Sequence, residues 1–425
     1  MRYDARQAGC AVRWYCASKN MKKKGLSLLH ILVINAGSSS LKYQFFNMDN
    51  HEVLAKGICE RIGAGGHMRH SVAGKVVLEK DTDMPDHSVA VENVLAALTD
   101  AEFGVISDMG MVDAVGHRVL HGGQKFSGSM VVNDEVLAAI EACIPLGPLH
   151  NPANLMGIRA CQKVMPGVPQ VAVFDTAFHQ TMPEQSYLYA IPYEYYEKYG
   201  IRKYGFHGTS HRYVSARCAE LYGKPAEQLN IITCHLGNGS SVAAVKGGKC
   251  FDTSMGLTPL DGLVMGTRCG SIDPAVVGFI CEQTGASASE VVTMLNKESG
   301  LLAVSGISGD YRDVSAADEA GDHRAHIARE MLFQSIKRYI GGYAAEMGGV
   351  DALVFTAGIG ENNDYLRQKV ADGLEFMGIA VDPVKNAGRG EDREISAEGA
   401  RVRTFVISTD EELMIAMDTE ELTSK

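Results

Sequence analysis

The sequence predicts an α/β protein of two or three domains, from its composition, its pattern of apolar runs and a weak internal repeat. The 425 residues are 46% hydrophobic and 21% charged, which is typical of globular proteins and excludes disordered, collagen-like and fibrous chains. At about 150 residues per domain, this length predicts two or three domains. Apolar runs followed by Gly, Asn or Asp turns and then by longer amphipathic stretches predict strands at 31–34, 171–174, 231–233 and 352–356.

The segment that contains the first predicted strand also resembles a secretion signal. Lys22, Lys23 and Lys24 precede an apolar stretch at 26–34, as in a signal peptide. The stretch runs directly into Asn35-Ala36-Gly37-Ser38, which is typical of a buried strand that enters a loop, so we favour a strand. Residues 1–28 show no clear periodicity and are expected to be an extension outside the fold.

Further along the chain, the apolar spacing between residues 325 and 347 predicts one long packed helix. The internal repeat matches Ile34 to Ser39 with Leu236 to Ser241, so that Gly37 corresponds to Gly239. Each copy is typical of a strand, a Gly-Ser turn and a second strand. A duplicated domain and a chance similarity of two turns both explain the repeat, and the residues alone do not separate them.

Charge and cysteine content restrict partners and compartment. Lys and Arg number 40 against 51 Asp and Glu, for a net charge of −11, which argues against nucleic acid or an anionic membrane as main partner. No apolar run reaches the roughly 18 residues of a membrane helix. The ten cysteines form no C-x-x-C pair, so we expect reduced thiols and a cytoplasmic protein.

Three glycine-rich loops are candidates for phosphate binding. The chain contains neither a P-loop nor a G-x-G-x-x-G motif. In the loops at 35–42, 235–241 and 358–362, glycine would let backbone amides approach a phosphate while Ser or Asn side chains donate hydrogen bonds. Each loop by itself is equally consistent with an ordinary turn, but three of them favour phosphate binding.

Several charged or polar residues occur in settings that suit an anion site. Arg118 and Arg268 are flanked by glycines, and a guanidinium matches two oxygens of a carboxylate or phosphate. His207 lies in a glycine-rich loop four residues before His211, where it could donate to developing charge or be a structural histidine. Asp175 follows an apolar strand, where α/β sheets bind ligands. Glu411 lies in a segment typical of a helix N-terminus, so its local sequence does not identify it as a ligand.

Nine segments carry a more specific signal: INAGSSSLKY (34–43), GHRVLHGG (116–123), PLHNPAN (148–154), FDTAFH (174–179), YGFHGTSH (204–211), HLGNGSS (235–241), TPLDGLVMGTRCGSIDP (258–274), SGDYRD (308–313) and TAGIGEN (356–362). Together they closely resemble the acetate kinase family. The resemblance implies two ribonuclease-H-like domains of the actin-like fold with nucleotide in the interdomain cleft, and a homodimer. It places the N-terminal domain at 29–174 plus 412–425 and the C-terminal domain, for nucleotide binding and dimerisation, at 175–411.

The resemblance implies reversible, Mg²⁺-dependent transfer of the γ-phosphoryl group of ATP to acetate, giving acetyl phosphate and ADP, with Mn²⁺ as an alternative metal. Arg118 would bind the carboxylate, and Arg268 with His207 would stabilise the transition state. Asp175 matches a catalytic acid or base, although we favour positioning through Mg²⁺-bound water or Arg268. Asn35 and Glu411 match the metal site. The segments matched to ATP contacts comprise Ser38, Ser40, Lys42, His235, Leu236, Gly237, Asn238, Gly239, Asp310, Tyr311, Arg312, Gly358, Ile359, Gly360, Glu361 and Asn362.

On the acid side, the resemblance places His150 near the carboxylate and Leu120, Leu149, Phe206 and Pro259 around the methyl group. Leu120 replaces the family's usual valine, so the pocket should disfavour longer acids by about 1 to 3 kcal/mol per methylene. A propionate or butyrate kinase is the nearest alternative. An actin- or Hsp70-like ATP-binding module would lack acetate dependence, and a metal hydrolase on His207, His211 and Asp175 is the weakest alternative.

Overall fold

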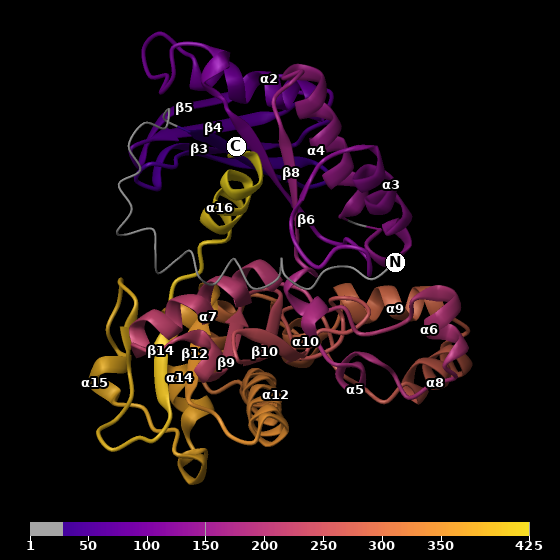
Figure 1. The fold of residues 1–425 in the computed structure, drawn as a ribbon. Coiled ribbons are helices and arrows are strands. Elements are labelled where there is room, and N and C mark those ends of the chain that lie inside the picture. The colour runs from indigo at the N-terminus through magenta and orange to yellow at the C-terminus, as the bar shows by residue number, and fades with distance from the viewer. Residues whose placement is uncertain (1–28, 149, 425) are drawn as a thin grey trace. The chain divides into compact units, whose positions relative to one another are not determined.

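The computed structural model describes residues 29–148 and 150–424, which form two compact units (Figure 1). The N-terminal unit contains residues 29–180 and 410–424, and the C-terminal unit contains residues 181–409. Asp175 and Glu411, which the sequence analysis assigned to the C-terminal domain, therefore both lie in the N-terminal unit. The expected extension at 1–28 and the predicted pocket residue Leu149 lie outside the described residues.

The N-terminal unit is built on an eight-stranded mixed sheet with the order β5-β4-β3-β2-β1-β6-β8-β7. β1 pairs antiparallel with β2 and parallel with β6, which in turn pairs parallel with β8. The elements of this unit are β1 (His30–Ala36), β2 (Ser40–Asn47), β3 (Glu52–Glu60), β4 (His67–Val72), β5 (Lys75–Asp81), α2 (His87–Leu98), η1 (Met109–Met111), β6 (Ala114–Val119), β7 (Met130–Val131), α3 (Asp134–Ala142), η2 (Ile144–Leu146), α4 (Asn151–Val164), β8 (Gln170–Phe174), η3 (Phe178–Thr181, whose last residue belongs to the C-terminal unit) and α16 (Glu411–Thr423).

Helices cover both faces of this sheet. Because alternate residues of a strand point to opposite faces, neighbouring residues of β1 pack against different helices. Leu32 and Ile34 of β1 pack with α2 and α4, while Ile31 and Val33 pack with α16. Gly116 lets α16 approach β6 closely, because a Cβ at that position would lie 2.5 Å from Thr419 Oγ1. As the resemblance implied, the last helix packs on the N-terminal sheet, against β1, β6 and β8.

The C-terminal unit is built on a six-stranded sheet with the order β11-β10-β9-β12-β14-β13. Its elements are α5 (Glu184–Tyr187), α6 (Glu194–Tyr199), α7 (Gly208–Tyr222), η4 (Ala226–Gln228), β9 (Asn230–Leu236), β10 (Ser240–Lys246), β11 (Lys249–Thr253), α8 (Ala275–Thr284), α9 (Ala288–Lys297), α10 (Gly300–Ser305), α11 (Tyr311–Glu319), α12 (His323–Met347), β12 (Ala352–Thr356), α13 (Ala357–Asn362), α14 (Asp364–Ala371), η5 (Glu375–Met377), α15 (Pro383–Asn386), β13 (Arg393–Glu394) and β14 (Arg403–Val406).

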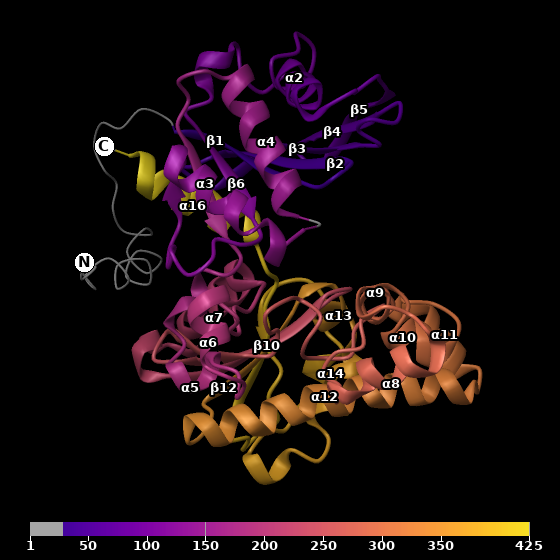
Figure 2. The same cartoon turned by 90° about the vertical axis from the view of Figure 1, so that its right-hand side faces the viewer.

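The core of this unit lies between the sheet and the long helix α12, which Figure 2 shows in side view. Ile232 and Cys234 of β9 face that core, whereas Thr233 faces α7 and hydrogen-bonds its His211. α12 begins after the N-cap Asp322 and ends at Gly348, a left-handed C-cap. It confirms the predicted helix at 325–347, and β1, β8, β9 and β12 confirm the four predicted strands.

The two sheets share one topology, which answers the question that the sequence repeat left open. β3-β2-β1-β6-β8 and β11-β10-β9-β12-β14 have the same order, with antiparallel pairs first and parallel pairs after. A chance match of two turns would not repeat five strands, so the domain is duplicated. The strand register corrects the alignment of the two copies of the repeat. Ala36 pairs with Leu41 at the end of β1, and Leu236 pairs with Ser240 at the end of β9. Gly37 therefore corresponds to Gly237 in the repeat rather than to Gly239.

Across 29–148 and 150–424, the helices include none that is long and apolar enough to cross a membrane.

Candidate active site

Arg118 and Asp175 form a partly buried ion pair with two hydrogen bonds in the N-terminal unit. Arg118 lies near the end of β6 and Asp175 directly after β8, and the parallel register of these strands brings them together. Arg118 Nε donates to Asp175 Oδ1 at 3.1 Å and Nη2 to Oδ2 at 2.8 Å. Asp175 is fully buried, and its charge raises the pKa of Arg118 against the opposing effect of burial. The guanidinium is thus held charged, with Nη1 directed away from this carboxylate's edge.

Glu411 supplies a second carboxylate, and it lies close enough to Arg118 and Asp175 for their charges to affect the pKa of Glu411. It is the first residue of α16, whose N-cap Asp410 accepts from Leu413 N. Burial, reinforced by the charges of Asp175 and other acids, raises the pKa of Glu411 to about 7, and Arg118 opposes the shift. Because burial and neighbouring acids disfavour the ionised form of this carboxylate, a bound cation would stabilise that form.

Asn35 and Glu411, the two residues matched to the metal site, both carry oxygen atoms that can bind a cation. Asn35 lies at the end of β1, against which α16 packs. Its amide oxygen and the Glu411 carboxylate are the hard oxygen donors that Mg²⁺ prefers, and a divalent cation would offset the acidic surroundings that raise the Glu411 pKa. The donor chemistry of these two residues therefore fits a Mg²⁺ ion.

A cavity of about 320 Å³ in the N-terminal unit is lined by two of the predicted site residues, Asn35 and Lys42. Sequence reasoning missed the rest of its polar lining, which includes Lys56, Arg69 and Glu412. These residues lie on neighbouring strands and at the start of α16, so no single motif joins them.

The remaining predicted residues of the N-terminal unit have different surroundings. Leu120 is buried, and its backbone N–H donates to Asn154 Oδ1, while Asn154 Nδ2 donates to Ala36 O. Asn154 therefore ties the Leu120 segment to the end of β1. His150 is exposed at the N-cap of α4, Ser38 is exposed, and Ser40 is half-buried where β2 begins.

Three histidines form a connected cluster in the C-terminal unit. The resemblance assigned roles to His207 and His235, whereas His211 was named only for the metal hydrolase. His207 Nδ1 and His211 Nε2 both hydrogen-bond Ser241 Oγ, at 2.8 and 2.7 Å. The His207 ring stacks on His235 with centroids 4.1 Å apart. We call His207, His211, His235 and Ser241 the histidine cluster. Because His207 and His211 share a hydroxyl and Asp175 is held by Arg118, these contacts do not favour the metal hydrolase.

Arg268 lies beside this cluster. A Cβ built on Gly239 would lie 3.4 Å from both Arg268 Nη1 and His207 Nε2, so both groups converge on that glycine. Nη1 donates to Pro259 O at 3.3 Å, and burial lowers the pKa of Arg268. Phe206, next to His207, is buried, and Pro259 is partly buried.

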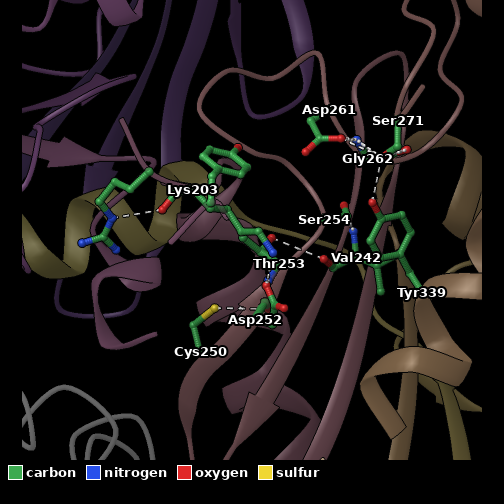
Figure 3. Close-up of polar contacts among 12 residues, drawn as sticks. Lys203, Val242, Cys250, Asp252, Thr253, Ser254, Asp261, Gly262, Ser271 and Tyr339 are labelled. Atoms are coloured by element: carbon green, nitrogen blue, oxygen red, sulfur yellow. Dashed lines mark hydrogen bonds and ion pairs between the residues drawn. The ribbon is translucent and has the colours of Figure 1, made fainter. Parts of the chain in front are cut away.

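Figure 3 shows what fixes the loop that carries Pro259 and Arg268. Ser271 Oγ donates to Asp261 Oδ1 at 2.6 Å and hydrogen-bonds Tyr339 OH at 3.0 Å. In the same view, Lys203 Nζ pairs with Asp252 Oδ1 at 2.6 Å, which anchors the segment leading to His207. Burial raises the pKa of Asp252, with Lys203 opposing the shift.

The predicted ATP-contacting residues occupy three places in the C-terminal unit. The first is the β9–β10 turn, which holds Leu236, Gly237, Asn238 and Gly239 after His235. The second is the start of α11, where Asp310 caps Arg312 N and pairs with its guanidinium at 2.6 Å, so that the Asp310 pKa falls to about 2. The third is α13, which contains Gly358, Ile359, Gly360, Glu361 and Asn362.

α13 is held at both ends by charged side chains. Glu361 Oε1 accepts from Ala357 N at 2.8 Å at the start of the helix, so this carboxylate caps its own turn. Arg367 Nη1 donates to Gly360 O and Glu361 O at 2.8 and 2.9 Å. Arg367 is fully buried and also donates to Asn386. Sequence reasoning missed Arg367, because an arginine in a helix is usually a surface residue.

With this geometry established, the chain can be compared with known proteins. The acetokinase family model matches residues 30–417. Acetate kinases of Caldanaerobacter subterraneus and Methanosarcina thermophila are 57% and 56% identical over 396 residues, which is 93% of this chain and 99% and 97% of theirs. A solved acetate kinase from Porphyromonas gingivalis aligns with a TM-score of 0.89 at 49% identity, covering 93% of this chain and 99% of that one. A propionate kinase from Francisella tularensis aligns at 0.86 and 43%, covering 93% and 100%. The chain therefore belongs to the acetokinase family.

Proposed function

We propose that this protein is an acetate kinase, which transfers the γ-phosphoryl group of ATP reversibly to acetate. The observation that carries the proposal is the Arg118–Asp175 pair, a guanidinium fixed by two hydrogen bonds at the end of neighbouring parallel strands. The family membership and the names of its relatives support the same activity. An ATP-binding module without an acid substrate would have no use for this arginine.

Acetate needs positioning rather than activation by a base. Carboxyl groups have pKa values of about 4 to 5, so acetate is already ionised near neutral pH. Asp175 occupies the Nε–Nη2 edge of Arg118, so acetate would be bound by Nη1 and the second Nη2 hydrogen. In this mechanism Asp175 orients Arg118, whereas we expected it to act through Arg268 or metal-bound water.

The transferring phosphoryl group develops charge on its equatorial oxygens, and fixed donors would stabilise it there. Arg268 and His207 serve this role in our proposal, because both reach the same side of Gly239. Ser241 orients His207 through Nδ1, which leaves Nε2 directed at that position. Bound Mg²⁺ or Mn²⁺, held by Asn35 and Glu411, would neutralise phosphate charge.

ATP would bind to the C-terminal unit through the β9–β10 turn, the start of α11 and α13. Backbone amides in these glycine-containing segments are suitable donors to phosphate oxygens. Lys42 and the Ser38–Ser40 turn would supply donors from the N-terminal unit. Within α13 we assign contact with nucleotide to Gly358, Ile359, Gly360 and Asn362, because the Glu361 carboxylate is used inside the turn.

From the resemblance, we propose that Leu120 and His150 of the N-terminal unit and Phe206 and Pro259 of the C-terminal unit bind the acid substrate, whereas Leu149 lies outside the described residues. Leu120 is buried, and a Cβ built on Gly147 would lie 3.0 Å from its Cδ2. One extra methylene in such a pocket changes discrimination by about 1 to 3 kcal/mol, so acetate should be preferred to propionate.

We also propose that the protein works as a homodimer in the cytoplasm. α8 has no buried residue although it is rich in apolar ones, and Phe279 on it is 64% exposed. An exposed apolar helix face is typical of an interface, and a second copy of the chain is the partner that we propose. The eight cysteines in the described part of the chain are free thiols, which suits a reducing compartment. Phe279→Asp should convert the dimer to monomer in light scattering, and an unchanged mass would count against this surface.

The test of the activity is acyl phosphate formation from Mg-ATP, trapped with hydroxylamine, with acetate, propionate and butyrate at matched concentrations. Acetate-dependent product that falls steeply with chain length is expected. Equal turnover of propionate would keep the chemistry and contradict the pocket, whereas ATP hydrolysis indifferent to any acid would contradict the activity.

A further inference from the structure

Thr409 contacts two parts of the C-terminal unit, helix α13 and the serine beside the histidine cluster. It is the last residue of this unit in the chain. Its backbone N–H donates to Glu361 Oε1 at 3.2 Å, and its Oγ1 donates to Ser210 Oγ at 2.8 Å. The first contact reaches α13, and the second leads to the histidine cluster. None of the nine sequence segments includes this residue.

The hydroxyl contact extends to His235. Ser210 Oγ lies 2.7 Å from His235 Nδ1, and both residues are buried. A serine hydroxyl has one hydrogen, and here it accepts the hydrogen of Thr409. Its own hydrogen is then directed to Nδ1 of His235, which places the proton of the neutral imidazole on Nε2. His235 thereby becomes a donor through Nε2.

The backbone contact acts on α13 through Glu361. The same Oε1 atom accepts from Ala357 N, which begins α13 in the left-handed conformation, with φ of 63°. A non-glycine residue in that region is conformationally unfavourable and persists only where surrounding contacts hold it. Glu361 provides such a contact, and the same oxygen also accepts from Thr409 N at 3.2 Å and, at the longer distance of 3.4 Å, from Thr356 Oγ1.

We propose that Thr409 is a positioning residue of the nucleotide site. Its hydroxyl, through Ser210, sets the tautomer and orientation of His235, and its amide holds Glu361 at the start of α13. The inference rests on the proposed function in that both His235 and α13 are taken to contact ATP. It adds that one residue contacts both, beside the β9–β12 pairing that already places Thr356 next to His235; this residue lies two positions before Glu411 in the chain.

The test uses Thr409→Val, which removes the hydroxyl and preserves shape and backbone N–H. Loss of one hydrogen bond of ordinary strength predicts about a tenfold fall in kcat with ATP. Thr409→Ser restores the hydroxyl and should stay within about twofold of wild type. The matched control is Thr404→Val, since the buried Thr404 hydroxyl has no hydrogen-bond partner in the described structure, and this variant should keep full activity.

The tautomer is measured directly by two-dimensional ¹H–¹⁵N correlation on histidine-labelled full-length protein, with His235 assigned through His235→Gln. Wild type and Thr409→Ser should show His235 protonated at Nε2, and Thr409→Val should show a mixture with Nδ1. An unchanged tautomer in a Thr409→Val protein of reduced activity would overturn the inference, as would full activity of that variant. Absence of acetate-dependent turnover in wild type, with the tautomer shift intact, would instead reject the proposed function alone.

Discussion

Asp175→Asn tests whether the buried carboxylate positions Arg118 or acts as a base. The substitution preserves size but replaces one acceptor oxygen with an NH₂ group, which would face a guanidinium N–H. One of the two hydrogen bonds at 3.1 and 2.8 Å is lost together with the charge pair. Removing one partner of a buried ion pair costs about 3 to 5 kcal/mol. The Arg118 side chain is 29% exposed, so water can partly solvate it and the lower value applies.

About 3 kcal/mol corresponds to roughly a hundredfold loss in kcat/KM for acetate. Because a displaced Arg118 binds acetate poorly before and during transfer, KM for acetate should rise while kcat falls, and KM for ATP should stay within about twofold. The assay is hydroxylamine-trapped acyl phosphate over a range of acetate concentrations, with thermal unfolding measured in parallel. Asp418→Asn is the control, since Asp418 is a buried aspartate of the same unit that hydrogen-bonds Ser129.

A fall in kcat with unchanged KM for acetate would refute the positioning argument and favour a base. Retention of more than a third of the wild-type kcat/KM would refute the magnitude. If Asp418→Asn reduced acetate affinity as strongly, the effect would belong to the fold of the unit rather than to the ion pair.

Three further predictions concern the metal, the acid and the nucleotide. Because the pKa of Glu411 is raised from 4.5 to about 7, the residue is protonated below that pH, so the apparent Mg²⁺ affinity should fall about tenfold per unit as pH drops from 7 to 5.5. Ionising Glu411 between pH 4.5 and 7 also destabilises the fold, so Mg²⁺ should raise Tm more at pH 8 than at pH 5.5; equal shifts would argue against Glu411 as ligand. Leu120→Val should raise the propionate-to-acetate ratio of kcat/KM by about tenfold, and an unchanged ratio would remove Leu120 from the pocket. Arg367→Met should raise KM for ATP more than KM for acetate, whereas Arg329→Met, at a buried arginine paired with Asp318, should lower Tm alone.

The sequence predicted those parts of the molecule that depend on local patterns. The apolar runs that became β1, β8, β9 and β12 are continuous because strands that are buried on both faces of a sheet need no alternation. The partner of Asp175 was not predicted, since only the register of β6 and β8 brings Arg118 to it. Glu361 was assigned to nucleotide because it belongs to a glycine-rich segment. Its role as a cap follows from the backbone of Ala357, which a sequence does not display.

The two arginines of the site are held differently, and the difference matches the steps that they serve. Arg118 is neutralised by Asp175, so acetate meets a charge that is already largely compensated and can be released again. Arg268 is desolvated, as its lowered pKa indicates, and its hydrogen bonds in the described part of the chain go to Pro259 O and Met265 Sδ, which are uncharged. An uncompensated, partly buried guanidinium stabilises added negative charge more than a paired one does. Arg268 should therefore act most strongly where phosphoryl charge accumulates, in kcat, whereas Arg118 should weigh more on KM for acetate. A protein with a net charge of −11 can bind two anionic substrates because these local arrangements, and not the overall charge, set the potential at the site.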